Sequence, residues 1–226
     1  MKLSKNTFSI LKNFSSLNSN ILVKEGNVLK TLTPAKNVMA EATVEEDFAT
    51  QFGIWDLGKF LGTISLFSDP DFEFEEGYVS IKGSNNSLIK YFYSEPSLLT
   101  VPTKEIDMPD TVVSFGWKQD IFNDLQRAAA VLQLPDLCIH NTDDGVFAEV
   151  LDKADRTTNS YSVELGDAVY DESAAFKYYF KVENLKMLQG DYTVNITEKV
   201  VSEFCNASGL DLKYWVALES DSVYSV

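Results

Sequence analysis

The sequence lacks the features that mark secreted and membrane-spanning proteins. Its 226 residues include only two cysteines, Cys138 and Cys205, which are too few for a disulfide framework or a zinc cage and suit a reducing cytosol. No apolar run reaches the roughly 18 residues that a bilayer-spanning helix needs. The opening Met-Lys-Leu-Ser-Lys has no apolar region of the kind found in secretory signals. We therefore expect a cytosolic location and no membrane partner.

Catalytic motifs are also missing. The one histidine, His140, lies two residues from Cys138, but no third group that would orient a Cys-His pair is evident. Phosphate-binding glycine loops, G-x-S-x-G and H-E-x-x-H do not occur. The acidic run from Asp69 to Glu76 lacks the central glycine and final bidentate glutamate of an EF-hand, and its alternating Phe and Glu residues are typical of a half-exposed strand or loop. We predict that the protein is not an enzyme and holds no metal or cofactor.

Positive charge is scarce and unevenly placed. Nineteen Lys and Arg against 34 Asp and Glu give a net charge of −15, which excludes a protein that coats nucleic acid with its whole surface. Residues 1–30, however, hold five lysines and one acid, a local charge of +4 that leaves −19 for the other 196 residues. Such a chain can still bind an anion if its fold separates the two surfaces.

The basic region coincides with a predicted amphipathic helix over residues 4–17, with Ser4 as its N-cap. Its core-facing side is predicted to hold Leu3, Thr7, Ile10, Leu11, Phe14 and Leu17. The opposite side holds Lys5, Ser9, Lys12 and Ser16. Because the helix carries no acid, this side is purely positive, although an ordinary solvated face is the alternative explanation.

The rest of the sequence predicts an α+β protein whose two halves share one scheme of long helix, strands, short helix and strands. In the first half we expect a short helix over 55–62 and strands at 21–23, 28–32, 38–42, 48–54, 63–67, 78–82 and 88–93. In the second half we expect a long helix over 117–134, with a core face of Trp117, Ile121, Leu125, Ala128 and Leu132, and a short helix over 183–189. The strands expected there are 137–140, 146–150, 160–165, 176–180, 192–197 and 214–218.

A connector is predicted between the halves. Three of the six prolines, Pro96, Pro102 and Pro109, cluster where neither a helix interior nor a central strand can form. Apolar residues in the same stretch favour an extended segment that lies on protein surface. We therefore predict domains at 1–95 and 111–226, joined by a connector at 96–110.

An ordered set of short segments runs across nearly the whole chain: Met1-Lys2-Leu3-Ser4-Lys5, Leu11-Lys12-Asn13-Phe14, Asn18-Ser19, Asp56-Leu57, Phe60-Leu61-Gly62, Ile64-Ser65-Leu66, Leu132-Gln133, Leu185-Lys186-Met187 with Gly190 and Tyr192, and Val216-Ala217-Leu218-Glu219 with Asp221-Ser222. This set resembles the T4-type bacteriophage DNA polymerase sliding clamps, the processivity factors of these phages. The resemblance implies the DNA clamp fold: two similar domains per subunit, helices lining a central hole, antiparallel sheets outside, and a closed head-to-tail homotrimer around double-stranded DNA.

The resemblance also implies a set of partners. Such clamps have no chemistry or cofactor of their own; they tether the replicative DNA polymerase and are opened by an ATP-driven clamp loader complex. In T4-like phages they also serve late transcription, with a late sigma factor and a coactivator as partners. The place of action is the cytoplasm of the infected bacterial host.

Residues can be assigned to DNA contact by their positions. We expect Lys5 and Lys12 to face the hole, with Lys2 near its rim. Lys59 and Lys186 are expected on the two short helices and Arg127 on the second long helix. The polar side of that second helix holds Gln119, Asn123, Gln126, Arg127 and Ala130, with Asp120 close by. The hole is therefore expected to be only weakly positive in the second domain.

Partners of these clamps insert a hydrophobic peptide beside the connector and near the C-terminal end. The candidate residues here are Ile106, Met108 and Pro109, with Tyr214, Val216 and Leu218. The alternative is that most are core residues, since 214–218 alternates like an ordinary strand. Two other functions stay open from the residues alone. One is an acidic, monomeric adaptor or scaffold without DNA binding, and the other is a carboxylate enzyme that uses Asp69 to Glu76.

Overall fold

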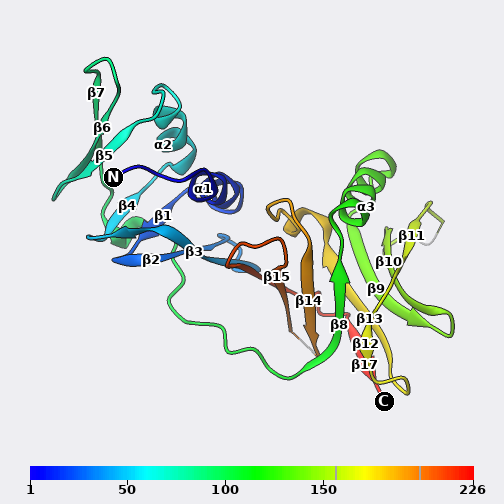
Figure 1. Cartoon of the computed structure of the whole chain (residues 1–226). Coiled ribbons are helices and arrows are strands. Elements are labelled where there is room, and N and C mark those ends of the chain that lie inside the picture. The colour runs from blue at the N-terminus through cyan, green and yellow to red at the C-terminus, as the bar shows by residue number, and fades with distance from the viewer. Residues whose placement is uncertain (156, 199) are drawn as a thin grey trace. The chain divides into compact units, whose positions relative to one another are not determined.

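The computed structural model describes residues 1–155, 157–198 and 200–226. The chain divides into two compact units, Met1–Lys104 and Glu105–Val226 (Figure 1). Each unit combines helical segments with antiparallel sheets, so the predicted α+β class is confirmed. The division falls inside the stretch 96–110 that the sequence predicts as a connector. None of the described helices is both long enough and apolar enough to cross a membrane.

Unit 1 begins with the predicted amphipathic helix, α1 (Lys5–Leu17). The Ser4 hydroxyl caps it by accepting a hydrogen bond from the Thr7 amide at 3.1 Å, as expected for an N-cap serine. The buried Glu46 carboxylate accepts bonds from the Ser4 amide and the Thr7 hydroxyl, which satisfies two more donors at this end. The buried residues of α1 are Thr7, Ile10, Leu11, Phe14 and Leu17, which confirms the predicted core face except for Leu3, which precedes the helix and is half-buried.

The remaining elements of unit 1 are β1 (Ile21–Val23), β2 (Gly26–Leu32), β3 (Val38–Phe48), β4 (Phe52–Ile54), α2 (Leu57–Ile64), β5 (Asp71–Phe74), β6 (Tyr78–Lys82), β7 (Leu88–Phe92) and the 3-10 turn η1 (Pro96–Leu98). Among these elements, α2, β2 and β3 contact α1. Strand β1 pairs with β4, β2 with β3, and β5–β6–β7 form a three-stranded sheet in that order.

Two stretches of unit 1, residues 48–54 and 55–67, differ from the predictions. The short helix starts at Leu57 rather than at residue 55, because Asp56 is its N-cap and accepts a bond from the Lys59 amide. It then continues through Gly62 to Ile64, so no strand forms over 63–67. The predicted strand over 48–54 is divided between the end of β3 and the separate strand β4. In both cases backbone capping and pairing decide the boundary, and side-chain alternation does not.

Unit 2 contains two antiparallel sheets and one long helix. Its elements are β8 (Thr111–Trp117), α3 (Gln119–Leu132), β9 (Asp136–Thr142), β10 (Gly145–Leu151), β11 (Tyr161–Leu165), β12 (Val169–Tyr170), β13 (Ala175–Lys181), the 3-10 turn η2 (Val182–Asn184), β14 (Tyr192–Thr197), β15 (Val201–Asn206), β16 (Leu212–Ala217) and β17 (Val223–Ser225). Within this unit the strand orders are β12-β8-β14-β15-β16 and β11-β10-β9-β13-β17.

The long helix of unit 2 has a different core face from the predicted one. Trp117 is the last residue of β8 and is buried, so α3 begins only at Gln119. Its buried residues are Phe122, Leu125 and Ala129, in place of Ile121, Ala128 and Leu132. The Phe122 ring packs edge-on against Trp117 at a centroid distance of 5.6 Å, and this bulky contact sets the rotation of the helix.

The predicted helix over 183–189 is also wrong. Only the 3-10 turn η2 forms, and the chain then runs extended with Leu185 and Met187 buried and Lys186 exposed. Two tyrosines explain this. The Leu188 amide donates to the Tyr214 hydroxyl at 3.1 Å, and the Leu188 carbonyl accepts from the Tyr192 hydroxyl at 2.6 Å. Because these side chains satisfy the backbone groups, the segment needs no helical hydrogen bonds.

The two units repeat one topology. In unit 2, β8 pairs with β14 and leads into α3. In unit 1 the backbone of Met1 pairs with Phe72 of β5, through two hydrogen bonds of 2.8 Å, and leads into α1. Helix α2 lies between β4 and β5, as η2 lies between β13 and β14. The repeat expected from the order of elements is therefore present, with the second short helix reduced to a turn.

Candidate nucleic-acid interface

The exposed side of α1 is a basic stripe. Lys5, Ser9, Lys12 and Ser16 are all exposed and lie on one helix face, as predicted. Within the described ranges, no acid forms an ion pair with Lys5 or Lys12. Two carboxylates at the start of the helix are engaged elsewhere: Glu46 is buried and accepts hydrogen bonds from Ser4 and Thr7, and Glu45 accepts from the Asn6 side-chain amide at 3.4 Å. The stripe therefore presents two uncompensated positive charges to solvent.

Lys2 differs from these two lysines because it has a partner. Its ammonium forms an ion pair with the exposed Asp69 carboxylate. The hydrogen bond that the Lys2 ammonium donates to the Asp69 carboxylate raises the pKa of Lys2 above its ordinary value. Together with Ser4, Lys5 and Ser9, it lines a cleft at the start of α1. Lys2 thus lies beside the basic stripe, with part of its charge balanced locally.

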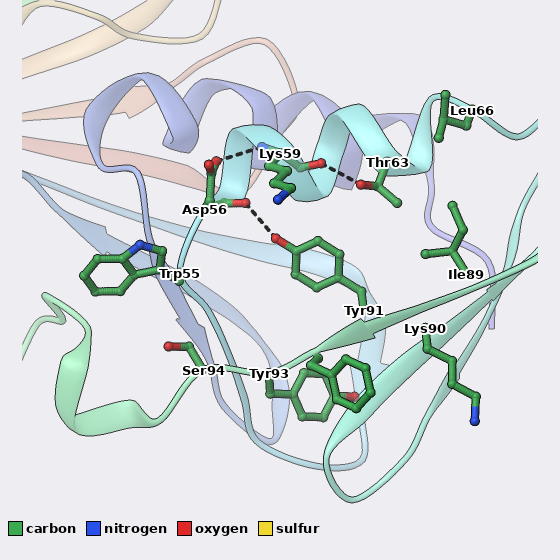
Figure 2. Close-up of a pocket in the computed structure, with 11 residues that line it drawn as sticks. Trp55, Asp56, Lys59, Thr63, Leu66, Ile89, Lys90, Tyr91, Tyr93 and Ser94 are labelled. Atoms are coloured by element: carbon green, nitrogen blue, oxygen red, sulfur yellow. Dashed lines mark hydrogen bonds between the residues drawn. The ribbon is translucent and has the colours of Figure 1, made fainter.

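Lys59 lines a different feature, a groove of about 590 Å³ between α2 and β7 (Figure 2). The groove is held by two contacts of Asp56. Its carboxylate accepts from the Lys59 amide at 2.8 Å, and its carbonyl accepts from the Tyr91 hydroxyl at 3.2 Å. The other lining residues are Trp55, Thr63, Leu66, Ile89, Lys90, Phe92, Tyr93 and Ser94. Lys59 lies on the short helix, as predicted, and its side chain is exposed. The residues around Lys59 are aromatic as well as basic.

This groove lies beside an open strand edge that the sequence did not reveal. Strand β7 ends the order β5-β6-β7, so one side of its backbone has no partner within the described part of unit 1. Three large apolar side chains of the groove are exposed: Trp55 by 58%, Leu66 by 73% and Phe92 by 69%. An open edge beside exposed apolar surface is a site for association with another chain. The residues 88–93 alternate as any strand does, and alternation carries no signal for an edge.

In unit 2, the basic side chains on and beside the long helix lie next to acids. Arg127, on the exposed side of α3, lies 3.5 Å from Asp124 of the same helix, and Asp120 is exposed near its start. Lys118 forms an ion pair with Asp191 at 2.8 Å, which lowers the pKa of Asp191 below its ordinary value. Lys186 is exposed, but it lies in the extended segment after η2 and not on a helix. The weakly positive hole expected in the second domain stays a prediction.

The predicted peptide-binding residues fall into two groups. Tyr214 and Val216 are completely buried in β16, so they are core side chains in this structure and are removed from the candidate site. Leu218, Ile106 and Met108 are half-buried, and Pro109 is exposed. Ile106, Met108 and Pro109 lie in a segment without helix or strand, consistent with an extended connector. These four residues remain a predicted site.

The groups considered for catalysis are engaged otherwise. Burial raises the pKa of the Cys138 thiol to about 12, so it stays protonated at neutral pH. His140 Nε2 lies 3.4 Å from Glu149 Oε2, and the His140 ring stacks on the ring of Phe147. In the acidic run, Asp69 and Glu73 form ion pairs with Lys2 and Lys82. Among the described residues, no group of three or more His, Cys, Asp or Glu side chains converges as a metal site.

Comparisons with known proteins agree on one family. Residues 114–220 match a family described as "gp45 sliding clamp, C terminal". The chain is 31% identical to the sliding clamp of Enterobacteria phage T4 and 30% identical to that of Escherichia phage RB69, each over 99% of both chains. It is 29% identical to the sliding clamp of Vibrio phage KVP40, over 97% of this chain and all of that protein.

Solved structures of similar fold come from cellular organisms. The A. fulgidus PCNA bound to the C-terminal region of FEN-1 superimposes with a TM-score of 0.72 at 14% identity, over 97% of both chains. The DNA polymerase III beta chain of Streptococcus pneumoniae gives 0.68 at 12% identity, over 94% of this chain and 63% of that one. At such identities the likeness establishes the clamp fold alone.

Proposed function

Because this chain belongs to the sliding clamp family of T4-type phages, we propose that it encircles duplex DNA and tethers the replicative DNA polymerase, which raises processivity. The observation that carries the proposal is the basic stripe of α1, which presents Lys5 and Lys12 without a neighbouring acid partner in a chain of net charge −15.

The chemistry of the stripe suits sliding. Contacts to phosphates hold a protein on DNA without reading sequence, and flexible lysines can exchange phosphates without a fixed geometry. The acidic remainder of the surface is screened from the DNA over a Debye length of about 10 Å at 0.1 M salt. It also disfavours binding of stray DNA outside the ring. The proposed role needs no catalytic group and no cofactor.

The proposed assembly is a head-to-tail homotrimer. Unit 1 has the open edge of β7 with the groove of Figure 2 beside it, and unit 2 has the open edge of β11, where Tyr161 is 37% exposed. We propose that β7 of one copy pairs with β11 of the next, because the two edges belong to different units and the contact can therefore repeat around a ring. The exposed apolar side chains of the groove would become buried at this contact.

The remaining partners follow from the family. We propose that an ATP-driven clamp loader opens the ring and that the polymerase inserts a hydrophobic peptide beside Ile106, Met108, Pro109 and Leu218. The half-exposed Met108 suits a surface that accepts several peptides, because its side chain is flexible. The late-transcription sigma factor and coactivator would be further ligands of the same surface. All of these act in the cytoplasm of the infected bacterial host.

Two measurements test the proposal. Light scattering of the full chain is expected to give the mass of a trimer. With the cognate polymerase and clamp loader on a primed circular single strand, the protein is expected to lengthen the products of one binding event. A monomer that leaves product length unchanged would favour the acidic adaptor instead.

A further inference from the structure

The two long helices carry opposite charge on exposed stripes of identical spacing. On α1 the exposed residues at steps of four, three and four are Lys5, Ser9, Lys12 and Ser16. On α3 the residues at the same steps are Asp120, Asp124, Arg127 and Val131, and all four are exposed. The first stripe sums to +2 and the second to −1. Helices at matching places in the repeated topology therefore present different potentials.

The contacts around each stripe preserve this difference. Near α1, Glu46 is buried and accepts hydrogen bonds at the helix start, while Glu45 is engaged by Asn6. On α3, Arg127 is paired with Asp124 at 3.5 Å, and the Asp120 carboxylate accepts from the Ile121 amide at 2.8 Å. The one basic group of the α3 stripe is thus balanced within its own helix, and a net acid remains.

We propose that unit 1 alone holds the phosphodiester backbone of duplex DNA, through Lys5 and Lys12, while Asp120 and Asp124 keep it away from α3. The inference rests on the proposed function and assigns the DNA contact to one unit of each subunit. In a homotrimer the duplex would then meet one basic stripe from each copy. Attraction to α1 and repulsion from α3 both act within a Debye length of about 10 Å at 0.1 M salt.

The test uses the full-length protein and a short open-ended duplex that can thread the ring. Its affinity is measured by fluorescence anisotropy over a range of salt concentrations. Three double variants are compared: Lys5→Gln with Lys12→Gln, Asp120→Asn with Asp124→Asn, and the matched control Lys24→Gln with Lys177→Gln. The control removes two exposed lysines that lie outside the helices. Light scattering and circular dichroism verify that each variant assembles and folds as the wild type does.

The α1 variant is expected to weaken binding and to lower the slope of log K against log salt by about 0.9 for each phosphate that the protein no longer neutralises. The α3 variant is expected to bind more tightly than the wild type, and the control to be unchanged. A fourth variant, Arg127→Gln with Lys186→Gln, is expected to lose less affinity than the α1 variant.

Two results would overturn the inference alone: equal losses of affinity from the lysine pair of α1 and the basic pair of unit 2, or no gain from the α3 variant. In both cases the wild type would still lengthen polymerase products, so the proposed function would stand. A wild type that neither binds the duplex at low salt nor lengthens products would overturn the proposed function together with the inference.

Discussion

The Tyr91 hydroxyl of β7 donates a hydrogen bond to the carbonyl of Asp56, the N-cap residue of α2, at 3.2 Å. The Tyr91 ring also packs edge-on against Phe60 of α2, at a centroid distance of 5.0 Å. The two contacts attach the open strand to the short helix, and Figure 2 shows the hydrogen bond. The groove between them is therefore a formed surface with a defined shape.

The groove leads to a prediction about assembly. Phe92 is 69% exposed, and burying a phenylalanine contributes about 1.5–3 kcal/mol. We expect Phe92→Glu to weaken association between copies by roughly tenfold or more at each contact. In light scattering over a dilution series, the variant trimer would dissociate at a higher protein concentration than the wild-type trimer. Leu98→Glu, at a similarly exposed site in η1, is the control, and equal effects of both changes would contradict the interface.

A second prediction concerns the basic stripe. We expect Lys5→Glu with Lys12→Glu to shorten loader-dependent polymerase products severalfold, because the variant replaces attraction to phosphates with repulsion. Both side chains are exposed, so the trimer mass should not change. Unchanged product length with an intact trimer would show that α1 does not face the DNA.

A third prediction concerns the connector. Titration of a peptide from the polymerase C-terminus against Met108→Asp should give an affinity roughly tenfold to a hundredfold lower, since the variant removes an apolar contact of about 1.5–3 kcal/mol. Val169→Asp, at an exposed apolar residue of β12, controls for the added charge. Equal affinity of wild type and Met108→Asp would reject the proposed peptide site.

A fourth prediction concerns acid stability. The Lys153 ammonium lies 2.8 Å from the Asp221 carboxylate and holds the pKa of Asp221 below its ordinary value near 3.8. A depressed pKa stabilises the folded state at every pH above the ordinary value, and this contribution is lost as pH falls through the folded pKa. We therefore expect the free energy of unfolding of Asp221→Asn to fall less on acidification than that of the wild type.

Denaturant titrations at a series of pH values would measure this effect. The wild type and Asp221→Asn should differ at neutral pH and converge in strong acid. Asp167→Asn removes an exposed carboxylate elsewhere in unit 2 and is the matched control. Parallel pH profiles for the wild type and Asp221→Asn would show that the ion pair adds no stability.

Local patterns predicted part of the fold well. Helix α1 follows from its 3.6-residue periodicity and its serine cap, and both are properties of adjacent residues. The rotation of α3 could not be read in the same way, because its sequence allows two overlapping apolar faces that share Leu125. The contact of Phe122 with Trp117 chooses between them, and Trp117 belongs to a strand. The helix expected over 183–189 fails for a similar reason, since Tyr192 and Tyr214 satisfy its backbone from later in the chain.

For the candidate sites too, local sequence patterns determined some features and tertiary contacts determined the others. Sequence alone determined the family, the two-part plan and the position of the basic stripe, because identity, order of elements and helical periodicity are written along the chain. Only the tertiary structure decided that Tyr214 and Val216 are core, that Arg127 is balanced by Asp124, and that β7 is an open edge. Burial, ion pairing and strand order depend on contacts between residues that are distant in the sequence, and no local pattern encodes those contacts.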